Sequence, residues 1–131
     1  MPHFIVEYSA NLEPAVDVKG LIRAIHGAAI DTGIFPLKGT RTRAVRRDIY
    51  EIADGHVDNA FVHIGAKIGH GRSVEIRQQA GEVIFNAACD YLRSYFDRHP
   101  LAVSFEIQEI DPAASFKLNN LPEWIEERKV S

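Results

Sequence analysis

Alternating hydrophobic and polar residues predict several β-strands along this chain. The clearest strand is at residues 60–68, where every second residue is aliphatic. Residues 1–8 and 101–107 alternate in a similar way, and residues 40–53 are rich in residues that favour β structure. A period of two is typical of strands that bury one face. We therefore expect four strands, the first of which begins at the very start of the chain.

Two longer segments have hydrophobic residues at helical spacing. The first helix is expected to open around Asn11 and Pro14 with a capping residue, and to end at Gly33 in a left-handed conformation. The second follows the capping-type Ser73 and ends before Pro100. A short helix is also expected around Trp124. The two hydrophobic stripes are Val18, Leu21, Ile22, Ile25 and Ala29, and then Ala80, Val83, Ile84, Ala87, Ala88, Tyr91, Leu92 and Tyr95.

The order of elements is strand, helix, strand, given twice. A crossover helix between two strands implies that the strands of each half are parallel. Two helices can cover one face of a four-stranded sheet, and the other face, which is partly apolar, is expected to pack against another subunit. Asp54 and Gly55 form a turn signal that, by itself, is typical of a hairpin between neighbouring strands.

The composition fits one globular domain over residues 1–131 with a core of its own. A net charge of −3 argues against general nucleic-acid binding. The sequence has no apolar run of membrane-spanning length and no signal-peptide pattern. The single cysteine, Cys89, is expected to be a small core residue in a reducing compartment. These features favour a cytoplasmic protein.

The second residue, Pro2, is a candidate catalytic base. Removal of Met1 is expected because the residue after it is small, and it would leave Pro2 with a free secondary amine. An ordinary α-amino group has a pKa of about 7.7–8.0. Burial and nearby cations lower this pKa, so that the amine would be neutral near the pH at which a general base works. A proline at this position also occurs in many chains without any such role.

Two arginines are candidate anion-binding residues. Arg41 is expected at the start of the second strand, and Arg72 lies in a glycine-rich turn just before a helix N-terminus, where anions are favoured. The planar fork of arginine suits carboxylates, although most arginines are exposed surface charges. Arg43, Arg46 and Arg47 are read as solvated or intersubunit charges.

The histidines do not suggest a metal site. His63 and His70 are too far apart for a helical pair of ligands, and no set of cysteines or carboxylates completes a zinc site. No nucleophile-elbow or phosphate-loop sequence is present. We therefore expect no metal.

Several short motifs together resemble the 5-carboxymethyl-2-hydroxymuconate isomerase family of the tautomerase superfamily. The similarity runs from Pro2 to about Asn120, and the tail beyond Asn120 has no matching motif. The segment at residues 44–47, with its paired arginines, departs from the family pattern. The motifs are MPHFIVE (residues 1–7), TGIFPL (32–37), FVH (61–63), GRS (71–73), RQQAGE (77–82) and SFEI (104–107).

The resemblance implies an α+β, two-layer tautomerase-like fold. In that fold each half pairs its two strands in parallel, and the first strands of the two halves meet antiparallel at the centre of a mixed sheet. The second strand then lies at an edge. Two helices cover one face, and three subunits assemble as a homotrimer. The tail from about residue 119 would be a trimer-packing or surface extension. A ferredoxin-like domain has the same order of elements.

The resemblance also implies a reaction. The enzyme would convert 5-carboxymethyl-2-hydroxymuconate, an unsaturated tricarboxylate from homoprotocatechuate degradation, into its conjugated 2-oxo isomer without a cofactor. Pro2 would act as general base and acid, while Arg41 and Arg72 would bind carboxylates and stabilise the dienolate. Two alternatives remain: another proline-based tautomerase, such as one acting on aryl pyruvates, and a ferredoxin-like binding module without catalysis.

Overall fold

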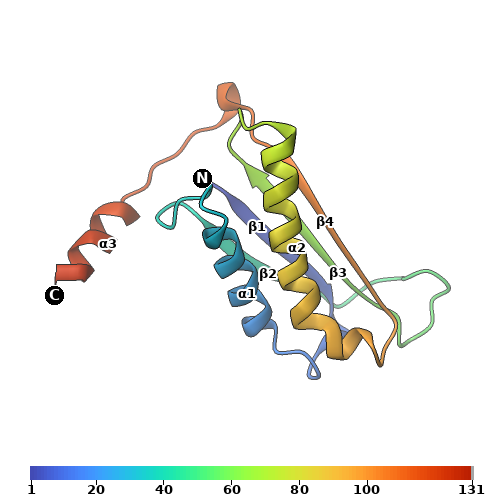
Figure 1. Ribbon diagram of the computed structural model, residues 1–131. Helices are drawn as coiled ribbons and strands as arrows, with labels where there is room; N and C mark the ends of the chain where they lie inside the picture. Colours follow the sequence, from blue (N-terminus) through green and yellow to red (C-terminus); the bar gives the residue numbers. More distant parts are fainter. Residues whose placement is uncertain (131) are drawn as a thin grey trace.

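A four-stranded mixed sheet forms one layer of the protein, and two long helices pack side by side on one of its faces (Figure 1). This computed structural model describes residues 1–130. Short 3₁₀ turns occur at Ala10–Leu12 and Pro112–Ala114. The elements are β1 (His3–Ser9), α1 (Val18–Asp31), β2 (Arg41–Arg47), β3 (Ala60–Ile68), α2 (Val74–Phe96), β4 (Leu101–Glu109) and α3 (Leu121–Val130).

The order of strands across the sheet is β2-β1-β3-β4. β1 is parallel to β2 and antiparallel to β3, and β3 is parallel to β4. This is the arrangement that the family resemblance implies, and it confirms the fold. The hairpin suggested by Asp54 and Gly55 is wrong, because β2 lies at one edge and the chain crosses past β1 before it forms β3.

The core lies between the sheet and the helices. On β1 and β3 every second side chain is buried against the helices, and the residues between them point to the open face. The hydrogen bond between His26 Nδ1 and Thr42 Oγ1 (2.8 Å) ties α1 to the edge strand β2. The fully enclosed hydrophobic residues include Phe4, Val6, Leu21, Ile25, Val62, Ile64, Ile84 and Ala88.

Two expected element boundaries are wrong, and side-chain amides explain both. β2 ends at Arg47 and does not reach residue 53. The residues that follow form a loop closed by Asn59, which donates to the Ile52 carbonyl (3.1 Å) and to Asp54 (2.7 Å). The first helix begins at Val18 because the amide of Asn11 is not a helix cap and donates to the carbonyl of Asn59 (2.7 Å).

The end of α1 and the start of α2 agree with the sequence-based expectations. Gly33 has φ +78° and ends α1 as expected. Ser73 caps α2, since its Oγ accepts from the Ile76 amide at 3.2 Å. The expected hydrophobic stripe of α2 is only partly buried, because Val83 and Tyr91 are 47% and 37% exposed. Cys89 is a free, half-buried cysteine on this helix, and burial raises the pKa of its thiol.

The open face of the sheet carries many charged side chains. Arg47 contacts Glu7 at 2.5 Å and Arg43 donates to His3 Nδ1 at 3.0 Å. On the helix side of β2, Arg46 pairs with Glu13 and Asp48. The arginines of the 43–47 segment therefore have partners within the chain. No helix among the described residues is long and apolar enough to cross a membrane.

Candidate active site

Pro2 lies buried at the start of β1, in the middle of the sheet. Its carbonyl accepts a hydrogen bond from the Arg41 amide at 3.0 Å. The next residue, His3, pairs with Arg41 on β2 and with Lys67 on β3. A strand held on both sides fixes the first residues of the chain, which would otherwise fray.

Arg41 lies beside Pro2 because β1 and β2 are parallel and in this register. Its Nη1 donates to the Gly39 carbonyl at 2.8 Å, and within residues 1–130 its other guanidinium donors have no hydrogen-bond partner and could bind a ligand. The loop at Gly39 runs close to Pro2. A Cβ at Gly39 would make ordinary van der Waals contacts, 3.9 Å from Pro2 Cδ and 3.5 Å from Pro36 Cγ.

Arg72 reaches the same end of the sheet from the loop between β3 and α2. Its Nη2 donates to the Ile34 carbonyl at 2.8 Å and its Nη1 to the Gly69 carbonyl at 3.3 Å. Its guanidinium also lies 5.2 Å from the centre of the Phe35 ring, a cation–π contact. The loop at residues 34–37 thus packs on the body of the protein through Phe35.

Phe35 anchors this loop. Its ring meets Phe4 edge to face with centroids 5.4 Å apart, and it is only 4% exposed. Since Phe4 follows Pro2 on β1 by two residues, the same aromatic contact links the position of Arg72 to the start of the strand. The site is therefore built on packed core residues.

The terminal amine lies in a strongly cationic environment. In the described chain this amine belongs to Met1, and its pKa is lowered from the usual value, first by burial and then by the charges of Lys117, Arg41 and Arg72. The pKa of His3 is also lowered, first by burial and then by Arg43 and Arg41. Desolvation and positive neighbours both favour the neutral form of an amine.

The structure thus brings together the three residues that the sequence singled out, Pro2, Arg41 and Arg72. It adds Lys117, which sequence reasoning missed. Lys117 lies in the tail between β4 and α3, outside any strand or helix. Its neighbours Phe116 and Leu118 form no periodic pattern, so no local signal points to the N-terminus more than a hundred residues away.

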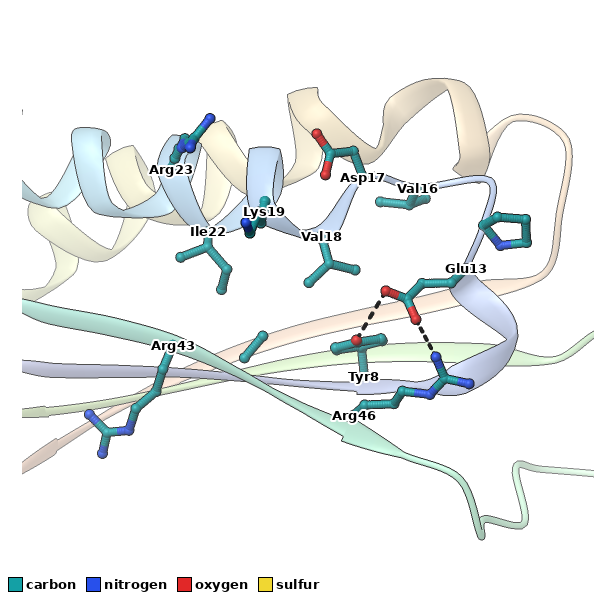
Figure 2. Close-up of a pocket in the computed structure, with 12 residues that line it drawn as sticks. Tyr8, Glu13, Val16, Asp17, Val18, Lys19, Ile22, Arg23, Arg43 and Arg46 are labelled. Atoms are coloured by element: carbon teal, nitrogen blue, oxygen red, sulfur yellow. Dashed lines mark hydrogen bonds and ion pairs between the residues drawn. The ribbon is translucent and has the colours of Figure 1, made fainter.

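A separate groove lies at the other end of β1, away from this site (Figure 2). It has a volume of about 1060 Å³ and lies between the start of α1 and the strands β1 and β2. Inside it, Glu13 accepts from Tyr8 Oη at 3.3 Å and pairs with Arg46. None of the three predicted site residues lines this groove. Within the described part of the chain, no three metal-ligating side chains cluster.

The parallel β1–β2 and β3–β4 pairs, joined antiparallel at the centre, define a tautomerase fold. A macrophage migration inhibitory factor-like protein from Entamoeba histolytica shares this fold, with a TM-score of 0.63 at 14% identity over 90% of this chain and 96% of that one. At this level of identity the likeness concerns the fold alone.

Sequence comparison is more specific. A family model described as 5-carboxymethyl-2-hydroxymuconate isomerase matches residues 2–125, and the chain belongs to this family. It is 46% identical over 121 residues to 5-carboxymethyl-2-hydroxymuconate Delta-isomerase of Escherichia coli, covering 92% of this chain and 96% of that protein. The crystal structure of a 5-carboxymethyl-2-hydroxymuconate isomerase from Deinococcus radiodurans R1 has a TM-score of 0.88, 34% identity, and coverage of 95% and 93%.

Proposed function

We propose that this protein is an isomerase that converts 5-carboxymethyl-2-hydroxymuconate to its conjugated 2-oxo isomer. The observation that carries this proposal is the buried position of Pro2 at the start of β1, beside Arg41 and at the same end of the sheet as Arg72. Removal of Met1 would give Pro2 a free amine at this position. Membership of the isomerase family supports the choice of reaction. A non-catalytic binding module would have no use for such an amine.

In the proposed reaction, Pro2 moves one proton. The neutral amine accepts the proton of the 2-hydroxyl group, so that the C2 oxygen becomes a carbonyl. The double bonds at C2–C3 and C4–C5 are replaced by one at C3–C4. The protonated amine then delivers the proton to C5, and the free amine is restored. No electrons or atoms are exchanged with another molecule, so the step requires no cofactor.

Arg41 and Arg72 have a binding and an electrostatic role in this proposal. Each guanidinium is held by at least one backbone carbonyl and is therefore oriented before substrate arrives. Donors fixed in this way can hold carboxylates and stabilise the negative charge that develops on the dienolate. Their charges also keep the amine neutral in the free enzyme.

The decisive experiment compares protein that begins at Pro2 with protein that carries an N-terminal tag. Intact mass should show that Met1 is absent from the active form. A spectrophotometric assay with the dienol tricarboxylate should give turnover for the untagged protein. The tag converts the amine into an amide, which has no basicity, so activity should fall by about 10²- to 10⁴-fold.

A matched control carries the same tag behind a protease site that leaves Pro2 as the first residue after cleavage. Cleavage should restore the activity, which excludes damage to the fold. Equal turnover by the tagged and untagged forms would rule out the amine as the base.

We also propose that the enzyme is a homotrimer in the cytoplasm, with active sites near subunit boundaries. Helices cover one face of the sheet only, and the tail exposes Phe116 and Leu118 almost fully, at 92% and 102%. One protein of the same fold, 18% identical, is described as a symmetric trimer, which is consistent with this assembly. The single cysteine, Cys89, fits a reducing compartment.

A further inference from the structure

The tail that follows β4 is attached to the two loops on either side of the terminal amine. At its start, the Ile110 amide donates to the Ile68 carbonyl (2.8 Å) and Glu109 accepts from the Gly71 amide (3.1 Å), next to Arg72. At its end, Glu126 on α3 pairs with Lys38, next to Gly39. The segment at residues 111–120 therefore crosses the end of the sheet at which β1 begins (Figure 1).

Short capping contacts define the turn at each end of this crossing segment. Asp111 accepts from the Ala113 amide at 2.9 Å and so caps the 3₁₀ turn. Asn119 accepts from the Leu121 amide at 3.0 Å at the start of α3. The residues between these two caps, 114–118, are exposed and link the two anchored ends of the tail.

Lys117 is the cation in this crossing segment. No ion pair or hydrogen bond of its side chain occurs among the residues that the structure describes. After burial, the charges of Lys117, of Arg41 on β2 and of Arg72 in the loop before α2 lower the pKa of the terminal amine of Met1. Three cations from three separate elements thus surround one end of the sheet.

The proposed substrate has three carboxylates of two kinds. Two are attached directly to the conjugated chain, lie in its plane and suit the planar fork of arginine. The third is carried on an sp³ carbon, so it can swing out of that plane. A lysine, with a compact charge on a flexible stem, suits a movable carboxylate better than it suits a fixed one.

We infer that Lys117 binds the carboxymethyl carboxylate of the substrate and is a specificity-determining residue. This inference rests on the proposed isomerase activity, because it assigns the one substrate charge that Arg41 and Arg72 leave without a partner. Lys117 would add little for a dicarboxylate that lacks the carboxymethyl arm.

The test compares two substrates in the untagged enzyme, 5-carboxymethyl-2-hydroxymuconate and 2-hydroxymuconate, which lacks the arm. At a pH where the rate no longer changes, Lys117→Gln should lower kcat/KM for the tricarboxylate about 10- to 100-fold, mainly through KM. The dicarboxylate should change less than about threefold. Lys117→Arg should retain most of the tricarboxylate activity, since it keeps the charge.

Lys19→Gln is the matched control, because Lys19 is an exposed lysine on α1 beside the distant groove, and it should change neither substrate. The fluorescence of Trp124, the single tryptophan, reports whether α3 stays docked in each variant. Equal losses for both substrates in Lys117→Gln would overturn the inference and leave the proposed function intact. If the wild-type enzyme turns over neither substrate, the proposed function itself is wrong and the assignment of Lys117 falls with it.

Discussion

At the scale of single residues, the proposed mechanism lets the terminal amine and the substrate influence each other through the same three cations. In the described chain, burial and then the charges of Lys117, Arg41 and Arg72 lower the pKa of the terminal amine, which belongs to Met1. A bound tricarboxylate would neutralise these charges, and the amine would become more basic at the moment when it must accept a proton. In this mechanism, substrate binding should therefore raise the pKa of the amine, and this increase can be measured.

We predict that the pH profiles of kcat and kcat/KM differ. Because kcat/KM follows the free enzyme, its acid limb should have an apparent pKa below the ordinary α-amino value of about 8. Activity should rise with pH through this value, since the neutral amine is the active form. The acid limb of the kcat profile reports the enzyme–substrate complex and should lie at higher pH than the acid limb of kcat/KM. Full kinetics across pH on the untagged enzyme measure both limbs.

Arg41→Ala and Arg72→Ala extend the same prediction. Each should lower kcat/KM for the tricarboxylate and also move its acid limb to higher pH, because a charge that lowered the amine pKa is gone. Circular dichroism should confirm that both variants remain folded. Variants with the wild-type kcat/KM and an unmoved limb would show that these arginines are surface charges.

The positions of Pro2, Arg41 and Arg72 in the sequence made them candidates, and the family resemblance implied their roles. Neither the positions nor the resemblance pointed to Lys117. The proposed role of Lys117 depends on where β4 ends and on the tertiary contact between Glu126 and Lys38. Such contacts leave no pattern in a short stretch of sequence.

At the scale of elements, hydrophobic period located the strands and helices but not all of their ends. Ile49 and Ile52 favour β structure, yet they follow the last residue of β2 and belong to a loop that is held by Asn59. Asn11 is a residue type that often caps helices, but its side-chain amide donates to the carbonyl of Asn59 in the same loop. In both cases a side-chain amide reaches across the chain, and local propensity is overridden by a distant partner.

The packing of α1 on α2 depends on a glycine. A Cβ at Gly20 would lie 2.0 Å from Tyr91 Oη, the hydroxyl that donates to the Asp17 carbonyl at 2.7 Å. Tyr91 can therefore cross the first turns of α1 only because residue 20 has no side chain. Gly27 lies in the same helix and has no neighbour within 4 Å of its Cβ position.

We predict opposite effects for the two glycines of α1. Gly20→Ala should displace Tyr91 and lower the free energy of unfolding by about 1–2 kcal/mol, after the gain in helix propensity. Gly27→Ala should raise it by up to about 1 kcal/mol. Urea unfolding at one fixed protein concentration measures both, because the stability of an oligomer depends on concentration. A stabilising Gly20→Ala would mean that the partly exposed side chain of Tyr91 moves aside at little cost.

At the scale of the whole molecule, the two faces of the sheet are unequal. The helices enclose one face, while the other presents ion pairs such as Glu7 with Arg47, with half-buried Ile5 and Phe61 between them. The strand order that creates these faces followed from the family resemblance. The turn signal at Asp54 alone would have given the wrong neighbours for β2.

We predict that three chains associate in solution. Light scattering at micromolar concentration should give about three times the chain mass of 14.7 kDa. The exposed apolar residues of the tail, Phe116 and Leu118, would be covered in such an assembly, so replacing both with serine should weaken it. A monomer that is stable and fully active would contradict the trimer.

The attachment of the tail at two loops has a consequence for how such an enzyme can evolve. In the proposed mechanism Pro2, just before β1, moves the proton with help from Arg41 on β2 and Arg72 in the loop before α2. Lys117 belongs instead to a crossing segment outside any strand or helix. After gene duplication, mutations in residues 111–120 could accumulate without disturbing the sheet or the amine. A new copy could thus acquire a different acid as its substrate while it inherits the proton transfer unchanged.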